Sequence, residues 1–109
     1  LAKEEKRLFD NDLEAWLHGP VVPELYERYK EYGYNPLPLP ENFSLKSIPK
    51  KIQGFLDDIY RVYGRYSAWR LRDITHQEPP WANAKARRRR KILDRDMMNF
   101  FKTQLEYLE

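Results

Sequence analysis

The sequence predicts an all-α fold: a compact single domain of about five or six helices, with room for one minor extended pairing. Apolar residues recur at steps of three and four over long stretches, which places them on one face of a helix. Proline and glycine separate these stretches, and both residues mark helix ends. No alternation of apolar and polar residues of comparable length indicates a strand.

In the first half, residues 13–17 are short enough to be extended or one helical turn. Pro23 suits the first turn of a helix, where its missing N–H costs nothing, and Gly33 suits the end of that helix. Residues 34–43 contain three prolines and are predicted to form an extended connecting loop. The apolar face of the helix between Pro23 and Gly33 consists of Leu25, Tyr26, Tyr29 and Tyr32.

The strongest helix prediction covers residues 48–63, with Ser47 as N-cap, Pro49 in the first turn and Gly64 after the end. Its apolar stripe comprises Ile52, Phe55, Leu56, Ile59, Tyr60, Val62 and Tyr63. Ser67 then caps a helix that should stop near Thr75, and its inward residues are Ala68, Leu71 and Ile74.

The last third of the chain predicts two further helices. Residues 81–90 form the first of them, and residues 92–93 form a second short extended piece. Asp94 is a good N-cap for the final helix. The buried stripe of that helix is expected to contain Met97, Met98, Phe101, Leu105 and Leu108.

Composition narrows the class of protein. The 109 residues suffice for one domain, so residues 1–109 are taken as a single unit with a modest core. No apolar run approaches the roughly 20 residues that span a bilayer, and no signal-peptide core is visible. The lack of cysteine excludes disulfides and thiolate metal ligands. We therefore expect a cytoplasmic protein without a membrane partner, and the sequence leaves the oligomeric state open.

Two proline-rich segments are the most informative part of the chain. The first corner (residues 15–23) contains Trp16, His18, Gly19 and Pro20, and the second corner (residues 75–81) contains Thr75, His76, Glu78 and Trp81. Each corner holds one of the two histidines and one of the three tryptophans. We expect the two histidines to lie near one another and to be structural or contact residues.

These corners resemble one known family. Residues 12–26, which include the first corner and Tyr26, look like the signature of the Panacea domain, found in SocA-like antitoxins and many phage-associated proteins. A second signature resembles Tyr63-Gly64, Ser67, Leu71 and the second corner, in the expected order. The resemblance runs from about Phe9 to the C-terminus. Family members usually begin with an apolar helix, which is cut here to a charged remnant, so either the chain is a fragment or another element replaces that helix.

The histidines do not indicate catalysis. His18, His76 and Glu78 could be read as metal ligands or as a catalytic set, but zinc needs three or four ligands in defined geometry, and no nucleophile accompanies them. The simpler interpretation is a network of hydrogen bonds that stabilises the corners. We therefore predict no enzyme activity, no cofactor and no metal site. Trp16 and Trp81 are either core residues or partner anchors. The tyrosines are too many for one small core, so some should lie at its edge.

The positive charge is concentrated in one segment. The basic run (residues 85–91) consists of Lys85, Ala86, Arg87, Arg88, Arg89, Arg90 and Lys91. Six of the 20 basic residues lie there, so the remaining 14 are outnumbered by 17 acidic residues. The run could bind nucleic-acid phosphates, attract an acidic protein, or be a solvated surface.

The resemblance implies a non-enzymatic antitoxin that neutralises a cognate toxin by direct contact. Some SocA-like members are thought to act as adaptors that deliver the toxin to a protease. The signature corners would hold the scaffold or line the contact surface, while variable loops would choose the toxin. The alternative is a nucleic-acid-binding or phage regulatory module that acts through the basic run.

Overall fold

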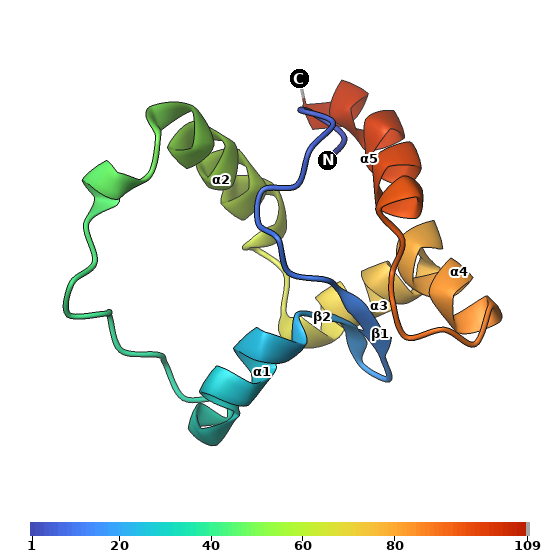
Figure 1. Cartoon of the computed structure of the whole chain (residues 1–109), viewed down its shortest axis with the longest axis horizontal. Helices are drawn as coiled ribbons and strands as arrows, with labels where there is room; N and C mark the ends of the chain where they lie inside the picture. The colour runs from blue at the N-terminus through green and yellow to red at the C-terminus, as the bar shows by residue number, and fades with distance from the viewer. Residues whose placement is uncertain (109) are drawn as a thin grey trace.

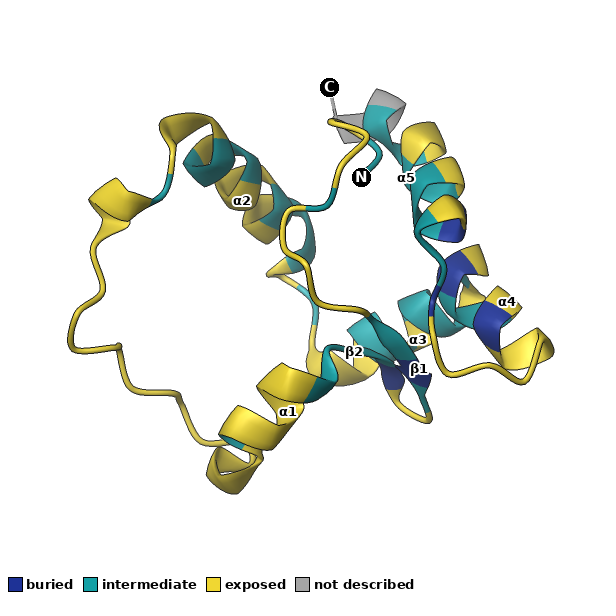
Figure 2. Cartoon of the chain, viewed as in Figure 1, coloured by how far each residue is buried: buried dark blue, intermediate teal, exposed yellow. Residues whose placement is uncertain are grey.

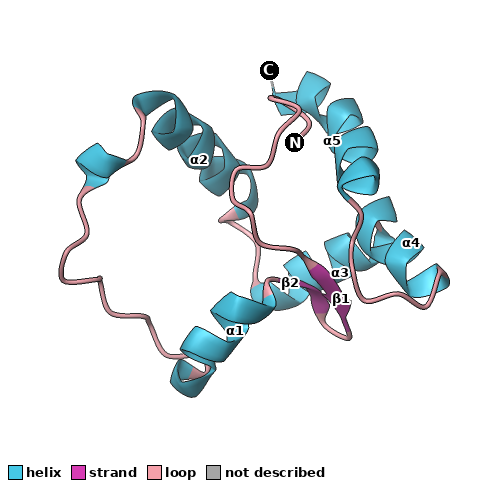
Figure 3. Ribbon diagram, in the orientation of Figure 1, coloured by secondary structure: helices cyan, strands magenta, loops and turns pink. Residues whose placement is uncertain are grey.

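The computed structural model describes the backbone of residues 1–108 and the side chains of residues 1–105. Within this range the chain is mostly helical, with five α-helices and one small antiparallel hairpin, as the sequence predicts (Figure 1, Figure 3). No helix in this range is long and apolar enough to cross a membrane. In chain order the elements are β1 (Glu14–Trp16), β2 (Gly19–Val21), α1 (Pro23–Tyr29), α2 (Lys50–Tyr63), α3 (Ala68–Gln77), α4 (Pro79–Ala86) and α5 (Asp94–Leu108).

The hairpin of β1 and β2 is built on the first corner. Ala15 pairs with Pro20, and Trp16 pairs with Gly19. The φ of Gly19 is 131°, a backbone conformation that residues with a Cβ rarely adopt. The other edge of β1 receives the chain that follows α4, because the Ala15 N–H donates to the Arg90 carbonyl at 2.6 Å. The extended alternative for residues 13–17 and the minor pairing are thus confirmed, although β2 was not predicted as the second strand. Residues 92–93 form no strand: the bridge partner of Glu14 is Lys91, and the Ile92 N–H donates to the Leu13 carbonyl at 2.8 Å.

Several helix ends follow the local sequence. Pro23 occupies the first turn of α1, and Gly33 lies beyond it with a positive φ of 54°. The Ser67 side chain accepts a hydrogen bond from the Arg70 N–H at 3.1 Å, so the predicted cap of α3 is confirmed. Gly64 directly follows α2, as expected.

Three predicted boundaries are wrong. The helix predicted for residues 48–63 begins at Lys50, because the Ser47 hydroxyl donates to the Ser44 carbonyl in a separate short 3-10 turn (Leu45–Ser47) instead of capping α2. Helix α3 passes Thr75 and ends at Gln77, since the prolines that follow can occupy the first turn of α4. Helix α4 ends at Ala86, so the helix predicted for residues 81–90 begins and ends earlier than expected.

The core is small and lies between the hairpin and α4 (Figure 2). Ala15, Ala84 and Ile92 are buried, and partly buried side chains packed against them are Leu13, Trp81 and Met97. The predicted inward face of α3 is only partly buried, and Ala68 is exposed. In α5, Met97, Met98, Phe101 and Leu105 are half-buried, and the side chain of Leu108 lies outside the described residues.

The apolar stripe of α2 does not enter this core. The stripe has the predicted helical spacing, but no residue of α2 is buried. Its residues Ile52, Phe55 and Ile59 instead line an open cavity of about 720 Å³. The N-terminal segment and α5, including Phe101, form other parts of that wall. The segment can be followed between α2 and α5 in Figure 1. Part of the stripe therefore faces this cavity.

Candidate partner-binding site

The two corners meet in space. The Trp81 indole Nε1–H donates to the backbone carbonyl oxygen of Trp16 at 2.8 Å. At the same end of the hairpin, a Cβ on Gly19, the strand partner of Trp16, would lie only 3.2 Å from the Thr75 hydroxyl oxygen. The Thr75 hydroxyl itself donates to the Arg72 carbonyl of α3. These contacts hold the hairpin against α3 and the start of α4, a region we call the corner junction.

Aromatic rings fill the corner junction. The His76 and Trp81 rings stack in parallel, with centroids 4.0 Å apart and planes inclined by 13°. Trp16 packs edge-on against Tyr26 of α1 at 5.0 Å, and its indole N–H donates to the Glu14 carboxylate at 2.9 Å. Both tryptophans are half-buried, so each has a packing role and an accessible edge. Pro20 of β2 also belongs to the junction and pairs with Ala15 of β1.

The two histidines belong to the same junction but have different partners. His18 is exposed at the hairpin turn, and its ring packs edge-on against Trp69 of α3 at 6.3 Å. His76 lies in the last turn of α3, and its Nε2 is buried without a hydrogen-bond partner among the described residues. The stack on Trp81 accounts for the orientation of His76. The aromatic partner of each histidine ring is thus a tryptophan, Trp69 for His18 and Trp81 for His76.

Glu78 connects α3 to α4 in an extended conformation. Its side chain is partly buried, and this burial raises the pKa of the Glu78 carboxyl. Burial also raises the pKa of the Tyr63 hydroxyl, and the nearby Glu78 charge adds to that increase. In the part of the chain that the structure describes, no group of three histidine, aspartate or glutamate side chains could hold a metal ion.

The sequence analysis did not select Trp69, which is the most exposed tryptophan of the three. Its side chain is 68% exposed on α3, and Leu17 at the hairpin turn is 67% exposed. The Arg72 guanidinium lies over the Trp69 ring at 5.4 Å. The helical periodicity could have identified this residue, because Trp69 lies off the face shared by Leu71 and Ile74. We call His18, Trp69 and Arg72 the Trp69 face.

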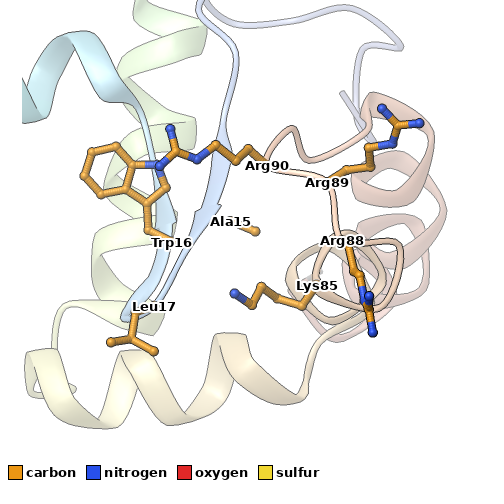
Figure 4. Close-up of a pocket in the computed structure, with 7 residues that line it drawn as sticks. All are labelled: Ala15, Trp16, Leu17, Lys85, Arg88, Arg89 and Arg90. Carbon is orange, nitrogen blue, oxygen red and sulfur yellow. The ribbon is translucent and has the colours of Figure 1, made fainter.

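The basic run begins in the last turn of α4 and continues beyond Ala86 as a loop. Arg87 forms an ion pair with the buried Asp96 of α5 at 3.0 Å, and Lys91 lies 3.7 Å from Asp12. The remaining cations of the run border a pocket of about 500 Å³ beside β1, which we call the cationic pocket (Figure 4). The residues that line it are Ala15, Trp16, Leu17, Lys85, Arg88, Arg89 and Arg90.

These features define a small, mostly helical domain whose surface displays aromatic and cationic side chains. The family model described as Antitoxin SocA-like, Panacea domain, matches residues 1–82, and the chain belongs to this family. The match includes both corners and ends before the basic run. None of the curated proteins and none of the solved structures matches the chain.

Proposed function

We propose that the protein is a non-enzymatic antitoxin that neutralises a cognate toxin by direct contact. Its membership of the SocA-like antitoxin family supports this function and implies a toxin as partner. The observation that carries the contact mechanism is the exposure of Trp69 beside a rigid junction. Tryptophan and arginine are enriched among the residues that dominate binding energy at protein interfaces.

The Trp69 face is held in place before any partner arrives. His18 packs on one side of the Trp69 ring, and Arg72 lies over it. The neighbouring Gly19 and Thr75 are in close approach, which fixes the hairpin turn relative to α3. A side chain that is already ordered loses less conformational entropy on binding than a mobile one. Burial of the ordered Trp69 side chain by a toxin would therefore contribute more to affinity than burial of a mobile side chain of the same size.

The corner residues hold together the elements that carry this face. Trp81 ties α4 to β1 through its hydrogen bond to Trp16, and His76 stacks on Trp81. We assign Trp16, Gly19, Pro20, Tyr26, Thr75, His76, Glu78 and Trp81 to the scaffold of the contact surface. His18 has both roles, because it is exposed at the turn and contacts Trp69.

Co-expression with the toxin encoded beside this protein tests the function. Wild-type protein should restore growth and co-purify with the toxin. The change Trp69→Ala should weaken the complex by at least about tenfold, as expected for the loss of a central aromatic contact. Tyr34→Ala is the matched control, because Tyr34 is a fully exposed aromatic residue in the loop between α1 and α2.

Two results would count against the proposal. Absence of any complex between wild-type protein and the neighbouring toxin would exclude neutralisation by direct contact. Equal effects of Trp69→Ala and Tyr34→Ala on toxin affinity would exclude the Trp69 face as the contact surface. Circular dichroism of both variants should match the wild type, since both side chains are exposed.

A further inference from the structure

We propose that the cationic pocket binds an acidic segment of the protein partner, with carboxylates against its cations and an apolar side chain against the hairpin. This inference rests on the proposed antitoxin function, because it takes the toxin as the source of that segment. Three observations indicate an acidic ligand. Some cations of the basic run lack a carboxylate partner, the backbone that carries them is ordered, and the remaining chain is acidic.

The basic run divides into two groups of side chains. Arg87 and Lys91 face aspartates of the same chain, Asp96 and Asp12. The other four cations have no carboxylate within 4.0 Å among the described residues, and all four line the pocket: Lys85, Arg88, Arg89 and Arg90. The unneutralised charge of the run is therefore concentrated at one place.

Backbone hydrogen bonds hold this loop in position. The Arg89 N–H donates to the Ala84 carbonyl at 3.0 Å, and the Arg88 N–H donates to the Lys85 carbonyl at 3.0 Å. Arg88 has a positive φ of 56°, which is uncommon for a residue with a Cβ and closes the end of α4. The Arg90 carbonyl then accepts the Ala15 N–H of β1. The backbone that carries these four side chains is thus ordered before a ligand binds.

The side chains form an inner and an outer pair. In Figure 4, Lys85 and Arg90 extend toward the hairpin, whereas Arg88 and Arg89 extend away from it. The hairpin side of the pocket is apolar, with Leu17 and Trp16 in the lining. Carboxylates beside the Lys85 ammonium or the Arg90 guanidinium would form charge-assisted hydrogen bonds, and an adjacent apolar side chain would contact Leu17. The outer pair would mainly steer the encounter.

The charge distribution favours an acidic protein over nucleic acid. Outside the basic run, 14 basic residues are outnumbered by 17 acidic residues, so the remaining surface has a net charge of −3. Strong nucleic-acid binding needs a cationic track that follows several phosphates. A single pocket on an otherwise acidic chain suits a short anionic segment better.

Fluorescence anisotropy with a short acidic peptide tests the pocket without the toxin. In this labelled probe, glutamates flank one leucine. Wild-type protein should bind it, and Lys85→Gln with Arg90→Gln should weaken binding by at least about tenfold. Arg88→Gln with Arg89→Gln should mainly slow association and reduce its salt dependence. The matched control is Lys46→Gln with Arg95→Gln. It also removes one lysine and one arginine charge, but from exposed positions outside the pocket.

A labelled single-stranded DNA of equal charge provides the competing arm. If it binds more tightly than the peptide and is lost with the inner pair, the pocket is a nucleic-acid site and the proposal is overturned. Absence of peptide binding, or equal losses in the inner-pair variant and the control, would also overturn it. These outcomes are independent of the toxin. If wild-type protein binds the peptide but no toxin, the proposed function fails while the ligand chemistry of the pocket stands.

Discussion

The Trp81 indole N–H and the Trp16 backbone carbonyl oxygen are 2.8 Å apart and join positions separated by 65 residues. This bond ties the hairpin to α4, and the same indole stacks on His76 of α3. Trp81 also packs against the buried cluster of Ala15, Ala84 and Ile92. One side chain thus connects three parts of the corner junction, so its removal should affect the whole domain.

Replacing Trp81 should reduce stability in two measurable steps. Trp81→Phe keeps an aromatic ring but removes the donor, so the free energy of unfolding should fall by about 1–2 kcal/mol. Trp81→Ala also removes the packing and should cost about 3–4 kcal/mol. Urea unfolding followed by circular dichroism measures both. Trp69→Phe is the control, because Trp69 is exposed and its replacement should change stability by less than about 0.5 kcal/mol. Equal effects at both positions would contradict the role of the Trp81–Trp16 bond.

Two glycines should respond in opposite directions to alanine. Gly19→Ala places a Cβ 3.2 Å from the Thr75 hydroxyl oxygen at a φ of 131°, so it should lower the free energy of unfolding by about 1–3 kcal/mol. Gly54→Ala lies within α2 with nothing within 4 Å of the new Cβ, so it should raise stability by about 0.5–1 kcal/mol. Thermal unfolding of the two variants checks the signs. A neutral Gly19→Ala would show that the hairpin does not need this conformation.

Neighbouring arginines of the basic run should differ in their effect on stability. Arg87→Ser leaves the carboxylate of Asp96, whose side chain is 10% exposed, without its ion-pair partner, and should cost about 2–4 kcal/mol. Arg88→Ser breaks no ion pair and should change stability by less than about 0.5 kcal/mol. The double variant Arg87→Ser with Asp96→Asn should recover part of the loss. Equal stability of the two single variants would argue against a structural role for Arg87.

The raised pKa of Glu78 predicts a pH dependence. A folded-state pKa above the unfolded value means that the folded chain binds the proton more tightly. This contribution to stability is present at low pH and is lost as the pH rises through the folded-state pKa. Glu78→Gln should therefore raise the melting temperature at pH 7 and have little effect below about pH 4, where the carboxyl is protonated in both states.

Melting temperatures of Glu78→Gln and wild type between these pH values provide the test. Glu24→Gln is the matched control, because Glu24 is an exposed carboxylate in the first turn of α1. The difference between Glu78→Gln and wild type should grow as the pH rises through the pKa of Glu78 and should level off above it. A difference that is constant across the range would show that the substitution acts through packing instead of the charge.

Local features allowed several elements to be predicted from the sequence. Ser67 caps α3, Pro23 begins α1 and Gly64 follows α2, because each residue acts through its own backbone or through a neighbour within one turn. Boundaries near prolines were harder to predict. A proline can end one helix or start the next, and at Pro79 the chain does both within two residues.

The sequence by itself also determined the family and the identity of the two corners, because residue types and order carry that information. The tertiary structure decided what those residues contact. Only the folded chain brings Trp81 to Trp16, exposes Trp69, and separates Arg87, which pairs with Asp96, from the cations of the pocket. The same holds for the stripe of α2, whose spacing predicts a helix face but not what covers it. The physical reason is that periodicity and capping depend on neighbours along the chain, whereas burial and ion pairing depend on residues that are distant in sequence.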